Sequence, residues 1–148
     1  MTASRDFRRQ VEALEELFAF TSGAFRAEGI DPALRPTVDL VLEELFTNVV
    51  KYGRKSGAAV RVELAGMPGG VEVTMIEDEA ERFDPTAAAA VDTAKPLEAR
   101  RAGGLGLHLV RKLVDSIEYR YVEASRQGRT AFRVTSVRAG RGEKNAGD

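Results

Sequence analysis

Two polar residues, Glu44 and Asn48, stand four positions apart in the segment LEELFTN. At about 100° per residue, a helix places both side chains at one edge of its apolar stripe. A carboxylate there could act as a general base, and an amide oxygen one turn later could ligate a hard cation such as Mg2+. In the structural alternative, Asn48 caps a neighbouring strand and Glu44 pairs with Lys51 or Arg54 at the surface.

A second candidate is the acidic segment EDEAERFDP, which follows an apolar run ending at Ile76. Five acids between positions 77 and 84 are typical of a solvated loop. Asp78 stands close behind the apolar run, so we expect it at the mouth of the core. A carboxylate in that place could accept a hydrogen bond from an amine of a ligand.

A glycine cluster, Gly103-Gly104-Leu105-Gly106, precedes a helical pattern. The free N–H groups of such a helix start can approach an anion, and the alternative is a flexible hinge. Neither GxGxxG behind an N-terminal strand nor GxxxxGK(S/T) occurs, which argues against Rossmann and P-loop folds. His108, the only histidine, is expected to be a packed or surface side chain, because a His-based metal site would need a second one.

Composition limits the classes of protein to consider. The chain has 148 residues, 43% of them hydrophobic, which predicts one domain that holds a core without disulfides or a structural metal. The absence of cysteine excludes thiol chemistry and makes the cytoplasm the expected location. The 22 basic and 23 acidic residues argue against nucleic acid or an anionic membrane as the main partner. No apolar run approaches the roughly 18 residues of a membrane span.

Apolar periodicity predicts two helices in the first third of the chain. The first covers residues 7–28, with apolar positions three and four apart, and Gly29 ends it. The second begins either at Asp31, followed by a proline, or later near Thr37. It ends before Gly53, which supplies the stop.

Two hairpins are predicted further along the chain. The runs 58–65 and 71–76 alternate around the turn MPGG, and the runs 117–123 and 130–137 alternate around the turn RQG. A third helix follows the glycine cluster. Residues 77–102 lack a sustained period and are expected to form a mobile loop. Residues 138–148 lack a core-forming pattern and are expected to be a disordered tail.

The order helix, helix, hairpin, loop, helix, hairpin predicts an α+β fold. Short connections within each strand pair imply an antiparallel sheet, and the three helices are expected to cover one of its faces. A single domain would then span residues 1–137, followed by the tail.

Taken in order, EELFTN, IEDEAERFDP and GGLGLHLVRKLVD resemble the ATP-binding motifs of the GHKL superfamily, whose fold is the Bergerat two-layer α/β sandwich. The similarity is greatest to the anti-sigma factor and switch protein kinase family typified by RsbW and SpoIIAB. It runs from about residue 7 to residue 137. The resemblance implies ATP and Mg2+ as cofactors. It also implies a first strand ahead of the first helix, for which only residues 2–8 are available.

The resemblance implies roles for individual residues. Glu44 matches the catalytic base, Asn48 matches the Mg2+ ligand, and Asp78 matches the acid that binds the adenine amine. The other nucleotide-binding positions that it implies are Ala80, Phe83, Gly103, Gly104, Leu105, Gly106, Leu107 and Thr130.

Ala80 departs from the family's D-x-G motif, which has glycine at this position. If the backbone there has a positive φ, alanine costs about 1 kcal/mol relative to glycine. On that basis we expect ATP affinity to fall by about tenfold without being lost.

The activity that the resemblance implies is that of an ATP- and Mg2+-dependent protein serine/threonine kinase. Its substrate would be a STAS-domain anti-anti-sigma factor, its second partner a sigma factor or another regulator, and its oligomeric state a homodimer. The alternative is a module of the same fold that sequesters a partner with weak or no nucleotide turnover. The catalytic fragment of a sensor histidine kinase is less favoured, because no phosphoacceptor histidine precedes the domain in this sequence.

Overall fold

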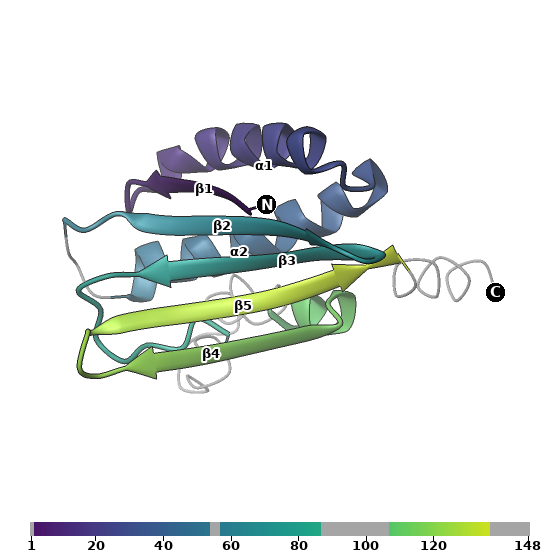
Figure 1. Ribbon diagram of the computed structural model, residues 1–148. Coiled ribbons are helices and arrows are strands. Elements are labelled where there is room, and N and C mark those ends of the chain that lie inside the picture. The colour runs from purple at the N-terminus through teal and green to yellow at the C-terminus, as the bar shows by residue number, and fades with distance from the viewer. Residues whose placement is uncertain (1, 54–56, 87–106, 137–148) are drawn as a thin grey trace.

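Five strands form one antiparallel sheet in the order β1-β2-β3-β5-β4 (Figure 1). The structure is a computed structural model that describes residues 2–53, 57–86 and 107–136. The strands are β1 (Thr2–Phe7), β2 (Val60–Met67), β3 (Gly70–Glu77), β4 (Ser116–Val122) and β5 (Gln127–Thr135). The α+β class expected from the sequence is confirmed.

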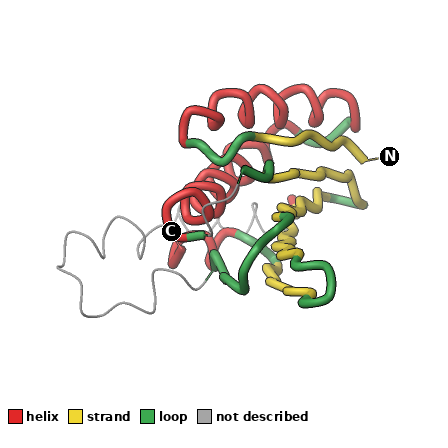
Figure 2. The backbone as a smooth tube through the Cα atoms, turned by 90° about the vertical axis from the view of Figure 1, so that its left-hand side faces the viewer, coloured by secondary structure: helices red, strands yellow, loops and turns green. Residues whose placement is uncertain are grey.

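Helices cover one face of this sheet (Figure 2). They are α1 (Leu14–Glu28), α2 (Arg35–Tyr52) and a helical segment at 107–113, with short 3-10 turns η1 (Val11–Ala13) and η2 (Pro32–Leu34). Gly29 ends α1, as predicted, and has the left-handed conformation with φ +64°. Asp31 caps η2 by accepting the N–H of Ala33 at 3.0 Å, and α2 begins only after that turn.

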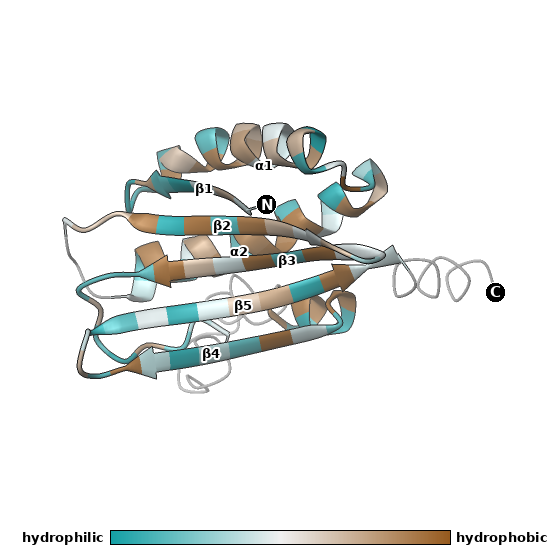
Figure 3. Cartoon of the chain, viewed as in Figure 1, coloured by the Kyte–Doolittle hydropathy of each residue, from teal (hydrophilic) through white to brown (hydrophobic). Residues whose placement is uncertain are grey.

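The alternation of residues along the strands decides which side chains face the helices. In β5 the buried residues are Gly128, Thr130, Phe132 and Val134, and hydrophobic and hydrophilic bands alternate along β2 in the same way (Figure 3). Pairing of β3 with β5 sets Met75 opposite Thr130 and Glu77 opposite Gly128. Residues 75, 77, 128 and 130 therefore share the face that the helices cover.

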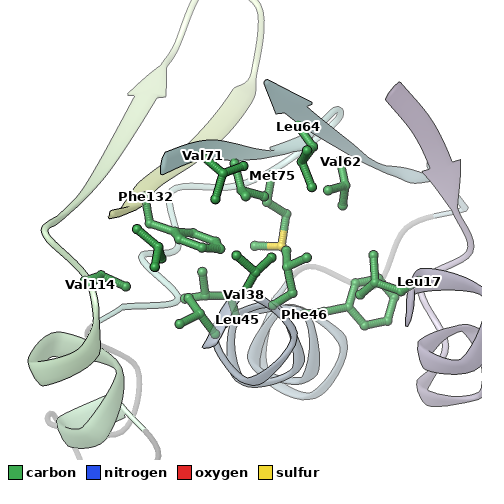
Figure 4. Packing of buried hydrophobic residues seen from close by; sticks show 14 of the residues in the cluster. Leu17, Val38, Leu45, Phe46, Val62, Leu64, Val71, Met75, Val114 and Phe132 are labelled. Atoms are coloured by element: carbon green, nitrogen blue, oxygen red, sulfur yellow. The ribbon is translucent and has the colours of Figure 1, made fainter. Parts of the chain in front are cut away.

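The core fills the space between the two layers (Figure 4). Helix α2 supplies Val38, Leu45 and Phe46, and the sheet supplies Met75 and Phe132, each at most 1% exposed. Because α2 carries apolar residues over much of its length, it runs through the centre of the interface rather than at its margin. The polar residues at the edge of its apolar stripe are thereby brought against the sheet.

The structure corrects the start of the first helix. Residues 2–7 are strand β1, α1 begins at Leu14, and Phe7 belongs to the strand. In β1 only Phe7 is fully buried, so the sequence shows no alternation that would predict a strand. The strand forms because its backbone pairs with β2 at the edge of the sheet.

The turn of the second hairpin is also corrected. It lies at 123–126, and Gln127 and Gly128 belong to β5. Arg126, with φ +52°, takes the left-handed position of this turn. Three predictions lie mostly outside the described residues: the glycine cluster at 103–106, the loop at 77–102 beyond residue 86, and the tail at 138–148.

Candidate functional site

Asn48 lies inside the molecule on α2. Its side chain is buried, and its Nδ2 donates a hydrogen bond of 3.0 Å to the carbonyl oxygen of Pro85. A carbonyl can only accept, so this bond determines which way the amide points and leaves Oδ1 as the remaining acceptor. The amide oxygen of Asn48 thus fits a hard cation, which needs oxygen ligands and usually takes only one or two from the protein.

Glu44 lies one turn earlier on α2 and is half-buried. Burial raises the pKa of its carboxyl group, and the negative charge of Glu43 raises it further, while Lys51 acts in the opposite direction. Among the described residues, no ion pair joins Glu44 to Lys51, and Arg54 lies outside them. A carboxylate with a raised pKa accepts a proton more readily, as a general base must.

The segment after β3 is tied to the hairpin of β4 and β5. The backbone N–H of Ala80 donates to the carbonyl of Arg126 at 2.8 Å, and the hydroxyl of Tyr121 donates to the carbonyl of Ala80 at 2.8 Å. The N–H of Phe83 donates to the hydroxyl of Tyr119 at 3.0 Å. These bonds lead the chain from the end of β3 to Pro85, where it meets Asn48.

Three further hydrogen bonds support that end of the segment. Asp84 accepts both the N–H and the hydroxyl of Thr86, at 2.8 and 2.6 Å. Arg111, from the helical segment 107–113, donates to the carbonyl of Thr86 at 2.8 Å. Leu107, the one residue of the predicted glycine-loop set that is described, is buried at the start of that segment.

The structure places Asp78 and Ala80 differently from the sequence-based expectation. The carboxylate of Asp78 is exposed and accepts a hydrogen bond of 2.9 Å from Gln127. The positive φ belongs to Glu79, at +52°, and not to Ala80, which is only 2% exposed. The expected strain at Ala80 is therefore wrong, because the left-handed residue of this turn stands one position earlier.

Glu77, directly before Asp78, is a buried acid on the helix-covered face. It is 2% exposed, and its Oε1 lies 3.4 Å from Nη1 of Arg9. Burial raises the pKa of Glu77 to about 7, and the charge and hydrogen bond of Arg9 offset only part of that effect. Arg9 also donates to the carbonyl oxygens of Ala58 at 2.8 Å and of Asp78 at 3.1 Å.

Next to Glu77, Thr130 is 1% exposed, and its Oγ1 is the only buried side-chain polar atom in the described residues without a hydrogen-bond partner. Leaving such a group unpaired costs about 1–3 kcal/mol. Gly128, opposite Glu77 in the sheet, lies close to both Glu77 and Tyr119: a Cβ on it would be 3.3 Å from Oε2 of Glu77 and 3.4 Å from the hydroxyl of Tyr119.

Four residues of this region were not predicted as site residues from the sequence: Glu77, Arg9, Tyr119 and Gly128. The alternation of Val71, Val73 and Met75 contains a signal for the first of these, because its next member is residue 77. No local pattern points to Arg9, which reaches the site from the connection between β1 and η1. Thr130, which the resemblance implies as a nucleotide contact, lies on the expected face.

Comparison with known proteins identifies the family. Residues 7–134 match the model of the histidine kinase-like ATPase domain, and the chain belongs to this family. The family implies that the chain binds a nucleotide. No curated protein matches the chain significantly.

A solved structure shares the fold. It is a chain from the crystal structure of the SiaB–SiaC complex from Pseudomonas aeruginosa, with a TM-score of 0.53 and 20% identity over 89% of this chain and 87% of that one. At this identity the likeness concerns the fold alone.

Among the helices described here, none combines the length and apolarity needed to cross a membrane.

Proposed function

We propose that the chain is an ATP- and Mg2+-dependent protein serine/threonine kinase that also binds and holds a regulatory partner. The observation that carries this proposal is the pair on α2: a buried amide whose nitrogen donates to Pro85, which orients its acceptor oxygen, and a carboxylate with a raised pKa one turn before it. A binding module without turnover has no need of the second group.

Phosphoryl transfer requires positioning and charge neutralisation more than covalent chemistry from the protein. When bound, Mg2+ neutralises charge on the nucleotide phosphates. Oδ1 of Asn48 would hold the ion, and Glu44 would orient the attacking hydroxyl of the substrate and accept its proton. Gly103, Gly104, Leu105, Gly106 and Leu107 would place backbone N–H groups against the phosphates.

The base of the nucleotide would lie at the other side of the site, against the sheet. Thr130 supplies an unpaired hydroxyl there, and the acids at the end of β3 supply acceptors. Phe83 and Ala80 would border the base from the segment that the β4–β5 hairpin holds in place.

The proposed phosphorylation substrate is a STAS-domain anti-anti-sigma factor, and the proposed second partner is a sigma factor or another regulator, bound by a homodimer of the chain. Two findings support a regulatory partner. The motif resemblance to anti-sigma-type kinases spans nearly the whole chain, and the solved structure with the same fold comes from a two-protein complex.

The alternative is a partner-sequestering module with weak or no nucleotide turnover. Its support is Ala80, which fills with a buried methyl group the position where the family motif has glycine. The two functions differ in whether phosphate leaves the nucleotide.

Labelled ATP, Mg2+ and candidate STAS-domain proteins test the proposal directly. We expect phosphate on a serine or threonine of the partner, and we expect Glu44→Ala to lower the transfer rate by about 10²–10⁴-fold while ATP still binds. The matched control is Glu43→Ala, because Glu43 is the exposed neighbour on the same helix. Equal rates for wild type and Glu44→Ala would show that Glu44 is not the base, and ATP binding without any transfer would favour the sequestering module.

A further inference from the structure

We propose that Asp84 is a positioning residue that fixes the peptide group after Pro85 and, through the carbonyl of that group, orients the amide of Asn48. This inference rests on the proposed function, since it concerns how the oxygen of Asn48 is presented to Mg2+. Asp84 acts through Asn48 and is assigned no contact of its own with the cation or the nucleotide.

One peptide group takes part in both hydrogen bonds that matter here. Its carbonyl oxygen, from Pro85, accepts from Nδ2 of Asn48 at 3.0 Å. Its N–H, from Thr86, donates to Oδ1 of Asp84 at 2.8 Å. The described part of the chain has no cis peptide bond, and the C=O and N–H of a planar trans peptide point in opposite directions. The carboxylate that fixes the N–H therefore also fixes the direction of the carbonyl.

The sequence Asp-Pro-Thr makes this arrangement local. The ring of Pro85 fixes its φ, so the following peptide group turns only about ψ of the proline. An aspartate side chain often accepts the N–H two residues later, and this bond sets the remaining angle. The hydroxyl of Thr86 donates to the same oxygen of Asp84 at 2.6 Å. Bonds within three consecutive residues thus hold the carbonyl of Pro85 in place.

Burial makes the direction of this carbonyl important for Asn48. Pro85 and Asn48 are both buried, and Thr86 is 8% exposed. A buried amide nitrogen needs an acceptor from the protein, and the carbonyl of Pro85 is that acceptor. If the carbonyl turned away, the amide could rotate and present its NH2 group, which a cation does not bind. Fixing the carbonyl keeps Oδ1 of Asn48 as the group offered to the ion.

The far side of the turn is anchored as well. The carbonyl of Thr86, next along the chain, accepts from Nη2 of Arg111 at 2.8 Å. Groups that orient a metal ligand typically change metal affinity by about 10–100-fold when they are replaced. Asp84 acts through one intervening peptide group, so we expect an effect at the lower end of this range.

Calorimetric titration of the full chain with ATP, once in saturating Mg2+ and once with a chelator in place of Mg2+, isolates the contribution of the cation. We expect Mg2+ to tighten ATP binding by wild type and Asn48→Ala to remove that gain. Asp84→Ala should weaken ATP binding in Mg2+ by about tenfold and leave binding without Mg2+ within about twofold of wild type. Equal weakening with and without Mg2+ would contradict a role in presenting Asn48.

Two conservative variants separate the geometry of Asp84 from its charge, and both keep a polar side chain in the turn. Asp84→Asn keeps the acceptor oxygen in place and loses the charge, so ATP binding in Mg2+ should stay within about threefold of wild type. Asp84→Glu keeps the charge on a side chain one methylene longer, so it should behave like Asp84→Ala. The reverse order would show that Asp84 acts through its charge and would overturn the inference.

The double variant Asp84→Ala/Asn48→Ala tests whether the two residues act as one unit. If Asp84 acts through Asn48, the double variant should bind ATP in Mg2+ no more weakly than Asn48→Ala alone. Losses that add would show a separate route and would overturn this inference while leaving the proposed function intact. ATP binding by wild type that does not depend on Mg2+, or that Asn48→Ala leaves unchanged, would overturn the proposed cation site and this inference with it.

Discussion

The two ends of the sheet differ in which residues have a positive φ: glycines at the end where β2 meets β3, and Glu79 and Arg126 at the other end. Where β2 meets β3, Gly69 has φ +73°, and Gly29 at the adjoining end of α1 has φ +64°. Gly70 packs so closely that a Cβ on it would lie 2.3 Å from the carbonyl oxygen of Val134. These glycines border a surface hollow of about 520 Å3. Glycine occupies each of these positions, so the backbone turns there at little cost.

At the opposite end the left-handed positions belong to Glu79 and Arg126, each with φ +52°. The same end holds the buried acid Glu77 and the unpaired hydroxyl of Thr130. Such features cost stability and cluster at functional sites. The two ends therefore differ: glycine relieves the backbone strain where β2 meets β3, whereas strained and unpaired groups lie together at the end that holds Glu77 and Thr130.

The largest expected effect is on the free energy of unfolding, at the end of the sheet where β2 meets β3. Gly70→Ala should lower the free energy of unfolding by about 3 kcal/mol, because the atom that a Cβ would meet is a backbone oxygen of β5. Urea denaturation measures this change. Gly66→Ala is the control, since its Cβ would make an ordinary contact of 3.5 Å with Ile30. Equal stability of the two variants would contradict the proposed difference between the two ends of the sheet. Weaker ATP binding by folded Gly70→Ala would contradict it as well.

At the opposite end of the sheet, Glu77 should make the free energy of unfolding depend on pH. Its pKa is raised from 4.5 to about 7 in the folded chain, so between these values the folded state holds more protons than the unfolded state. The free energy of unfolding should therefore fall as pH rises through this window, by at most about 3 kcal/mol. Arg9 forms the ion pair with this carboxylate, and the hydroxyl of Tyr119, whose pKa burial raises, stays neutral across this range.

Denaturation of wild type and Glu77→Gln at pH 5, 6, 7 and 8 isolates this contribution. Glutamine removes the titration, so wild type should lose stability relative to the variant as pH rises. Parallel pH profiles would show that the carboxylate stays charged when buried.

Gly128→Ala makes the same change as Gly70→Ala at the other end of the sheet. Its Cβ would lie 3.3 Å from Oε2 of Glu77, the end of a side chain that can move. We therefore expect stability within about 1 kcal/mol of wild type and ATP affinity reduced by about tenfold, because the methyl group would push the side chains of Glu77 and Tyr119 aside. Calorimetry measures both quantities, and unchanged ATP affinity would contradict this reading of the glycine.

The smallest expected effect concerns the turn after β3. Glu79→Gly should raise the free energy of unfolding by about 1 kcal/mol, because glycine tolerates φ +52° without strain. Ala80→Gly is the matched control and should lower it by about 1 kcal/mol, since it removes a buried methyl group. Thermal denaturation compares the two, and a stabilising Ala80→Gly would show that the strain lies at Ala80 after all.

Local periodicity alone determined most of the elements. The body of α1, the end of α2 and the first hairpin follow from apolar spacing of three and four or of two, because these periods depend on the geometry of the backbone itself. The spacing of Glu44 and Asn48 on one helix edge is a property of the same kind. Both residues could be proposed from sequence because neither depends on a distant part of the chain for its place on α2.

Local periodicity predicted neither strand β1, which only the family resemblance implied, nor the position of the second turn. The polar residues of β1 pair with β2 through their backbone, and backbone pairing does not require any particular pattern of side chains. Gly128 carries the strongest turn signal of its region, yet it lies within β5, where Glu77 and Tyr119 leave little room for a side chain. A glycine in a sequence does not reveal whether φ or space requires it.

The sequence by itself determined that acids follow β3 and that a hydroxyl stands at position 130. Only the tertiary structure decided which acid faces inward, because that depends on where the alternation of β3 stops and on the register of β3 against β5. It also decided the partner of that acid, since Arg9 lies 68 residues away in the chain. Such contacts form only after the sheet has assembled, and no local pattern encodes them.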